Sequence, residues 1–137
     1  MIYRGACHCG VVRAEYETDA PVRLRQDGCS FCSNRGVKSA SDPNGALRIV
    51  SERKLTRYRF AHKTADYLIC PVCGTYVATY MEGPSGPVGV VNVVGLNIPE
   101  LKDEPATFAS LEGETPDERI ARRLSRWTPM TLQEPAS

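Results

Sequence analysis

Three pairs of closely spaced cysteines are the residues of this chain best suited to chemistry. The pairs are Cys7 with Cys9, Cys29 with Cys32, and Cys70 with Cys73. In a reducing compartment, cysteines at such short spacings are metal ligands or reactive thiols more often than disulfides. Zinc takes four soft ligands in a tetrahedron, so two of the three pairs suffice for one complete site.

The first and third pairs predict a structural zinc site. Cys7 and Cys9 flank one residue in "CHC", and "CPVCG" holds the other two thiolates, so each pair can reach one ion from a single turn. Gly74 lets the second turn bend, and His8 is not needed as a fifth ligand. Because four thiolates leave no open position, the ion would clamp two distant parts of the chain. The alternative is a set of buried free thiols.

The elements that must position these cysteines are short strands. Segments rich in β-branched and aromatic residues, bounded by Gly, Pro and Asp turn signals, predict a mainly β protein. The expected strands lie within residues 10–17, 22–26, 47–50, 55–60, 66–70, 75–80 and 88–96. The last segment is almost wholly apolar, which is typical of a strand buried on both faces.

One helix is expected near the C-terminus. Thr115 can cap it, Pro116 can be its first residue, and Glu118 completes a Thr-x-x-Glu capping box. An apolar stripe and an arginine face follow from the helical spacing; they are Ile120, Leu124 and Trp127, and Arg119, Arg122, Arg123 and Arg126. We expect the stripe to pack on the sheet and the arginines to be solvated. An acid- or phosphate-binding role for the arginines is the alternative.

Composition and charge indicate one globular domain, residues 1–137. Of the residues, 42% are hydrophobic and 24% are charged, and 17 basic against 16 acidic side chains leave a net charge of +1. Near-neutral charge disfavours an extended nucleic-acid-binding surface. The N-terminus lacks the apolar core of a signal peptide, and the apolar run 87–96 is too short to span a membrane. We therefore expect a cytoplasmic protein; no feature predicts an oligomeric state.

With these motifs in view, the chain resembles the glutathione-dependent formaldehyde-activating enzyme family, which includes the centromere protein V group. The resemblance rests on four stretches in the same order. They are "GACHCGVVRAEYE" at 5–17, "CSFC" at 29–32, "LTRYRF" at 55–60 and "YLICPVCGTYVATY" at 67–80. It implies an Mss4-like fold, in which small antiparallel sheets and hairpins are clamped by the four-cysteine zinc, with one short C-terminal helix.

The resemblance also implies a second, catalytic zinc at a C-x-C-S-x-C motif linked to glutathione. Here Cys29, Ser30 and Cys32 match that motif, but Asp27 stands where it has its first cysteine. Aspartate is itself a zinc ligand, so two cysteines and Asp27 would leave one coordination position open. Asp27 can otherwise be a general base, or simply a turn-forming residue beside Gly28.

The implied activity is that of a carbon–sulfur lyase acting on glutathione adducts of small aldehydes. Glutathione carries two carboxylates, and Arg35 and Lys38 are the cations that follow Cys32 most closely, with Arg25 just before the motif. The alternative for each is an ordinary surface charge. Two other classes remain open: a zinc-stabilised binding module with a degenerate second metal site, and a zinc-ribbon nucleic-acid binder, which near-neutral charge disfavours.

Overall fold

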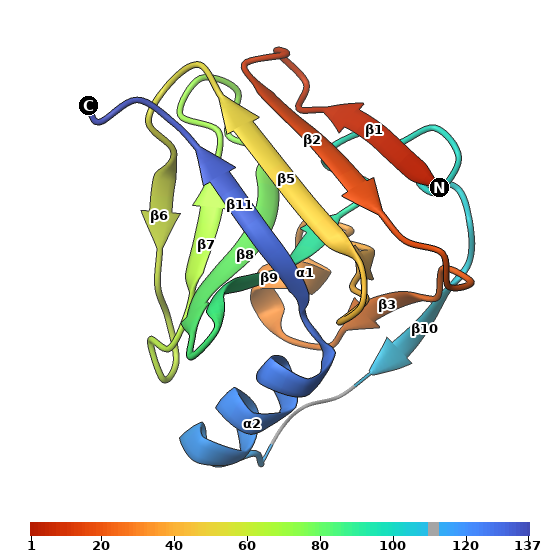
Figure 1. Ribbon diagram of the computed structural model, residues 1–137, viewed down its shortest axis with the longest axis vertical. Coiled ribbons are helices and arrows are strands. Elements are labelled where there is room, and N and C mark those ends of the chain that lie inside the picture. Colours follow the sequence, from red (N-terminus) through yellow and green to blue (C-terminus); the bar gives the residue numbers. More distant parts are fainter. Residues whose placement is uncertain (110–112) are drawn as a thin grey trace.

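The computed structural model confirms a mainly β protein and describes residues 1–109 and 113–137 (Figure 1). Its strands, in chain order, are β1 (Ile2–Ala6), β2 (Val12–Glu17), β3 (Leu24–Asp27), β4 (Ser39–Ala40), β5 (Ala46–Ser51), β6 (Thr56–Tyr58), β7 (Asp66–Ile69), β8 (Tyr76–Gly83), β9 (Gly86–Asn92), β10 (Ala106–Ala109) and β11 (Thr128–Gln133). The helices are α1 (Ser30–Ser33) and α2 (Pro116–Arg126). No helix in the described ranges is long and apolar enough to cross a membrane.

The strands form one open, mixed sheet with a branch. The main order is β1-β2-β5-β11-β9-β4-β3-β10, and β8, β7 and β6 extend from β9. Most neighbours are antiparallel, as expected, but β10 pairs with β3 and β11 pairs with β5 in parallel. Parallel pairing needs a long connection between the two strands, and β10 and β11 both lie far along the chain from these partners.

Strand β11 joins two layers of this sheet. Its first residues, Thr128 and Pro129, pair with β9, and residues 130–133 pair with β5. The four strands β1, β2, β5 and β11 form the front layer in Figure 1, with β8 and β9 behind them. Strands β1 and β11, which lie near the two ends of the chain, belong to the same sheet, with β2 and β5 between them.

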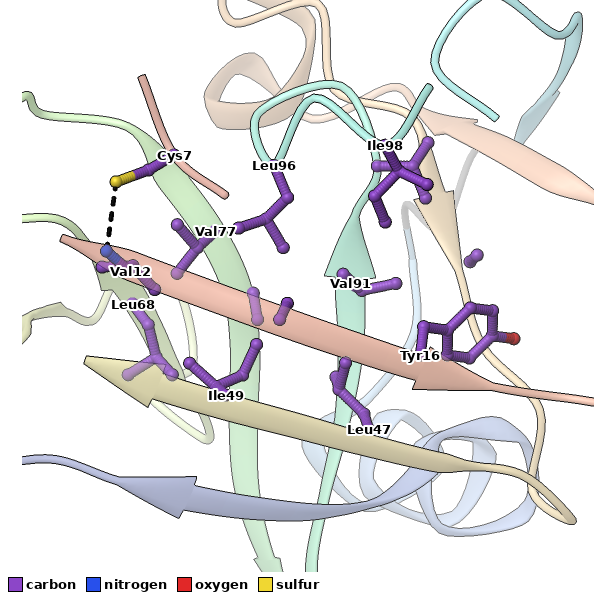
Figure 2. Close-up of a cluster of buried hydrophobic side chains, with 14 of the residues drawn as sticks. Cys7, Val12, Tyr16, Leu47, Ile49, Leu68, Val77, Val91, Leu96 and Ile98 are labelled. Carbon is purple, nitrogen blue, oxygen red and sulfur yellow. Dashed lines mark hydrogen bonds between the residues drawn. The ribbon is translucent and has the colours of Figure 1, made fainter. Parts of the chain in front are cut away.

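The main hydrophobic core lies between these layers. Burial alternates along β2 and β5, as expected for strands with one face inward. Val12, Tyr16 and Ile49 from the front layer pack with Val77 and Val91 from the rear layer (Figure 2). The apolar run predicted as one strand to residue 96 ends as a strand at Asn92, and residues 93–98 turn instead to bring Leu96 and Ile98 into the core.

Helix α2 forms as predicted and packs on the opposite side of β8 and β9 from much of this core. The Thr115 hydroxyl accepts a hydrogen bond from the Glu118 amide, and the Glu118 carboxylate accepts one from the Thr115 amide. Trp127 is buried, and Ile120 and Leu124 pack with it against Met81 and Val90. The expected solvated arginine face is wrong for three of its four residues, because Arg123 is buried and the side chains of Arg119 and Arg122 are mostly buried.

Candidate functional site

The four cysteines predicted to form one site come together from two turns. Cys7 and Cys9 lie between β1 and β2, and Cys70 and Cys73 lie between β7 and β8. Their sulfur atoms all lie within 4.8 Å of one another. The Cys9 sulfur lies 3.6 Å from those of both Cys7 and Cys70, far beyond the disulfide bond length of about 2.05 Å.

The spacing and surroundings of this cluster fit a zinc ion. Zinc–sulfur bonds of about 2.3 Å place tetrahedral ligands about 3.8 Å apart, close to the observed separations. The Val12 amide donates a hydrogen bond to Cys7 Sγ at 3.3 Å, which Figure 2 shows at the edge of the core. Gly74 takes a φ of +77°, the left-handed backbone that the tight turn after Cys73 requires. The cluster can therefore hold a metal ion in a closed, four-thiolate site.

The remaining cysteines, Cys29 and Cys32, follow the C-terminal end of strand β3. Asp27 ends that strand, Cys29 is the N-cap residue of the four-residue helix α1, and Cys32 lies within the helix. Cys29 is exposed and Cys32 is buried. The ligand atoms of Asp27, Cys29 and Cys32 are not as tightly clustered: in the described part of the chain, only the four-cysteine set brings three or more such atoms within 4.8 Å.

The two cysteines of this loop differ in acidity. A hydrogen bond from the Cys32 thiol, helped by the backbone amides of Cys32 and Phe31, lowers the pKa of Cys29 to about 6. The same hydrogen bond and burial raise the pKa of Cys32 above its ordinary value. The negative charge of the Asp27 carboxylate also acts to raise the pKa of both thiols. Without an ion bound, Cys29 is thus the more nucleophilic sulfur.

Asp27, Cys29 and Cys32 line one cavity of about 190 Å³. Strands β7, β8 and β9 provide one side of it, and helix α2 provides another. The other lining residues are Arg25, Gly28, Phe60, Tyr67, Tyr76, Thr79, Val90, Arg119, Arg122, Arg123 and Trp127. The cavity therefore combines two thiols and a carboxylate with an aromatic wall and four guanidinium groups.

An aromatic cluster fixes the cysteine loop at this position. Phe31, between the two cysteines, stacks on Phe60 at 5.3 Å between ring centroids and meets the edges of Tyr67 and Tyr76 at 4.9 and 5.0 Å. Such aromatic pairs each contribute about 0.5–1.5 kcal/mol beyond their buried area. The side chain of Phe31 thereby anchors α1 to β7 and β8, and Cys32 is buried in the same cluster.

Arg35 and Lys38, the cations expected to bind the carboxylates of a thiol, do not line this cavity. The Arg35 guanidinium covers the Phe31 ring at 3.9 Å and donates to the Phe31 carbonyl oxygen. Lys38 Nζ donates to the carbonyl oxygens of Lys102 and Glu104. Both side chains are occupied with structural contacts.

The arginines that do line the cavity are Arg25, which precedes the cysteine motif, and three from α2. Sequence reasoning found the helix but could not assign its arginines to this site, since nothing in the sequence relates α2 to the loop at 27–32. The available signal was spacing: Arg119, Arg122 and Arg123 follow one another at i, i+3 and i+4, which places them on one helix face.

Comparisons with known proteins agree with these features. The sequence matches the protein-family model described as glutathione-dependent formaldehyde-activating enzyme over residues 2–109. The chain is also similar to a Rhodobacter sphaeroides protein of known crystal structure. The two are 30% identical, the match covers 93% of this chain and 99% of the other, and the TM-score is 0.50. The family match includes all six cysteines and ends before helix α2.

Proposed function

The chain belongs to the glutathione-dependent formaldehyde-activating enzyme family, and from this membership we propose that it is a carbon–sulfur lyase. It joins a small-molecule thiol such as glutathione to a small aldehyde and catalyses the reverse cleavage. The observation that carries the proposal is the single cavity lined by Cys29, Cys32 and Asp27. Small-molecule sites combine an apolar wall with a few placed polar groups, and this cavity has both.

The proposed reaction needs one proton acceptor and a confined carbonyl. The sulfur of the thiol attacks the aldehyde carbon, a carbon–sulfur bond forms, and the π electrons of the carbonyl move to its oxygen. When Asp27 is not bound to metal, its carboxylate takes the thiol proton and returns it to that oxygen, so the product is an S-hydroxyalkyl adduct. The Tyr67, Tyr76 and Phe60 side chains limit access of water on the apolar side.

We also propose two zinc positions in the protein. The four-cysteine cluster is the structural one, and the second is held by Cys29, Cys32 and Asp27. Two thiolates and a carboxylate are an acceptable donor set for zinc with one position left open. A zinc ion there supplies a Lewis acid that favours the thiolate form of an incoming thiol.

The test combines zinc content with adduct exchange. We expect about two zinc ions per chain in gently purified protein, falling to about one in the Cys29→Ser/Cys32→Ser double variant and in Asp27→Ala. We expect the protein to accelerate exchange between free and glutathione-bound ¹³C-formaldehyde, measured by NMR, and the double variant to lose that acceleration. Exchange that is equally fast with both proteins would overturn the proposal.

A zinc-stabilised binding module is the second candidate. The observation that favours it is Asp27, which stands where the family motif resembled by this sequence has a cysteine. On this reading the second metal site is degenerate. One zinc ion in the wild type and both variants, unchanged by added zinc or glutathione, together with no acceleration of exchange, would support the binding module over the lyase.

A further inference from the structure

The cavity carries more positive charge than the reaction proposed above requires. Four guanidinium groups line it: those of Arg25, Arg119, Arg122 and Arg123. The carboxylates associated with them are Asp27, which lines the same cavity, and Glu114, which pairs with two of the arginines. Among the described residues that line the cavity, cationic side chains therefore outnumber carboxylates by four to one.

Arg123 is the least compensated of these charges. Its side chain is buried, with a relative exposure of 5% for the residue. Nη1 donates to Thr64 Oγ1 at 2.7 Å, and the guanidinium lies 4.7 Å from the centre of the Trp127 ring. Nε is buried and is the one such side-chain atom in the described residues without a hydrogen-bond partner. A buried guanidinium with an unused donor is costly unless an acceptor arrives.

Arg122 and Arg119 are held beside the cavity by Glu114. Arg122 donates to the two carboxylate oxygens of Glu114, from Nε at 2.8 Å and from Nη2 at 3.1 Å. Arg119 Nε donates to the same carboxylate at 3.4 Å. Both arginine side chains are mostly buried, at 15% and 20% exposure. Glu114 therefore holds both guanidinium groups in place, and Arg122, which gives this carboxylate two of its five N–H donors, keeps others for a second anion.

We propose that these arginines bind the carboxylates of the cavity's ligand, and that Arg123 and Arg122 make the site selective for small anionic thiols over neutral ones. The inference rests on the proposed function only in taking the same cavity as the binding site. The planar guanidinium fork matches a carboxylate through paired hydrogen bonds, which a lysine cannot provide. Because the aromatic wall on β7 and β8 is neutral, the carboxylate end of the ligand would lie on the arginine side of the cavity.

Helix α2 would thus supply the specificity of this chain. The family match ends at residue 109, whereas three of the four arginines belong to α2. The reactive thiols lie on the loop at 27–32, within the matched region. Reaction chemistry and anion recognition therefore come from different parts of the sequence that meet at one cavity.

The experiment measures binding without reaction. S-methylglutathione keeps both carboxylates but has no free thiol, and its diethyl ester lacks the carboxylate charges. We expect calorimetry to show binding of S-methylglutathione to the full-length, zinc-loaded protein and at least tenfold weaker binding of the ester. Arg123→Gln and Arg122→Gln should each weaken S-methylglutathione binding about tenfold or more, the range for a lost charge-assisted hydrogen bond.

Three variants complete the design. Arg123→Lys should retain only part of the affinity, because a lysine keeps the charge but not the fork. Arg35→Gln removes the cation favoured by sequence proximity, and Arg48→Gln removes a surface cation on β5; neither should change binding. Since Arg123→Gln removes a buried side chain, its folding is checked by circular dichroism, and Arg122→Gln tests the same point independently.

The outcomes separate this inference from the proposed lyase. Charge-selective binding that depends on Arg122 and Arg123 supports the inference even if no adduct exchange is accelerated. Equal affinity for the acid and the ester, or no binding of either, overturns it even if exchange is accelerated. Inorganic phosphate serves as a competitor: if it displaces S-methylglutathione at lower concentration than succinate does, the preferred anion is a phosphate and the carboxylate assignment is wrong.

Discussion

Asp66, the first residue of β7, is a buried carboxylate held by Arg57 of β6 and by Arg59, which follows that strand. Its two oxygens accept hydrogen bonds from Arg57 Nη1, at 3.0 Å, and from Arg59 Nε. Burial by itself would raise the pKa of Asp66, but the hydrogen bonds from Arg59 and Arg57 bring it below its ordinary value. A lowered folded-state pKa means that the ion pairs stabilise the fold above the unfolded-state value of about 3.9. That contribution is lost as the pH falls through the folded-state pKa.

We therefore expect Asp66→Asn to lower the free energy of unfolding by about 1–3 kcal/mol at pH 7, a range reduced for the partial exposure of both arginines. The difference from the wild type should begin to shrink below about pH 4, where the carboxylate protonates in the unfolded chain, and should disappear below the folded-state pKa. Urea unfolding at pH 7 and pH 3 measures both effects. Asp19→Asn, at an exposed carboxylate, is the control and should change little at either pH. A deficit of equal size at both pH values would contradict the charge argument.

Single residues also show how far a sequence can predict this site. The cysteine pairs at 7 and 9 and at 70 and 73 are recognisable because their spacing alone defines a ligand set, and the structure brings their sulfurs together. Closeness in sequence to Cys32 predicts Arg35 and Lys38 as carboxylate-binding cations. It does not determine where a side chain points, and both of these donate to backbone carbonyl oxygens instead. Arg123 lay 91 positions from Cys32, so only the tertiary fold could place it at the same cavity.

At the scale of elements, α2 is the segment that local chemistry specifies most fully. Its cap, first-turn proline and apolar stripe are all readable in sequence, and each forms in the structure. Strands β2 and β5 were also predictable from local sequence, since buried and more exposed residues alternate along them as expected for strands with one buried face. Strands β10 and β11 were not, because each depends on an edge offered by a partner distant in sequence. Strand β1 was not predicted either, although its partner β2 is the next strand in the chain. Helix α1 has only four residues, too few for a periodic signal.

The cap of α2 gives a prediction at this scale. Thr115→Ala removes the side-chain acceptor of the Glu118 amide and should lower the free energy of unfolding by about 1 kcal/mol. For a domain of this size that loss corresponds to a fall of about 3–5 °C in the melting temperature, measured by circular dichroism. Glu118→Gln keeps a side-chain acceptor for the Thr115 amide and should lose less. A Thr115→Ala protein as stable as the wild type would show that α2 is held by its packing alone.

At the scale of the whole molecule, the four-cysteine cluster connects two parts of the sheet that strand pairing does not join directly. One turn links β1 to β2 in the front layer, and the other links β7 to β8 in the rear layer. Cys7 and Cys70 are both buried in the main core, beside residues from each layer. A metal ion at this point would hold the two layers together at one end, while β11 joins them at its own crossing from β9 to β5.

We expect Cys73→Ser to abolish the tightly held zinc and to prevent stable folding, as should Cys7→Ser. Structural zinc sites of this kind contribute about 10–16 kcal/mol of apparent binding free energy, which is comparable to the whole stability of a small domain. Loss of one thiolate therefore removes most of what keeps the two layers together. Zinc content and thermal unfolding measure the two effects in the same sample. His8→Ala, a change between two ligands that leaves all four sulfurs, is the matched control and should bind zinc and melt as the wild type does. A Cys73→Ser protein that stays folded and zinc-replete would refute the assignment of a structural zinc to these four cysteines, and would show that β11 and the apolar core hold the layers together without it.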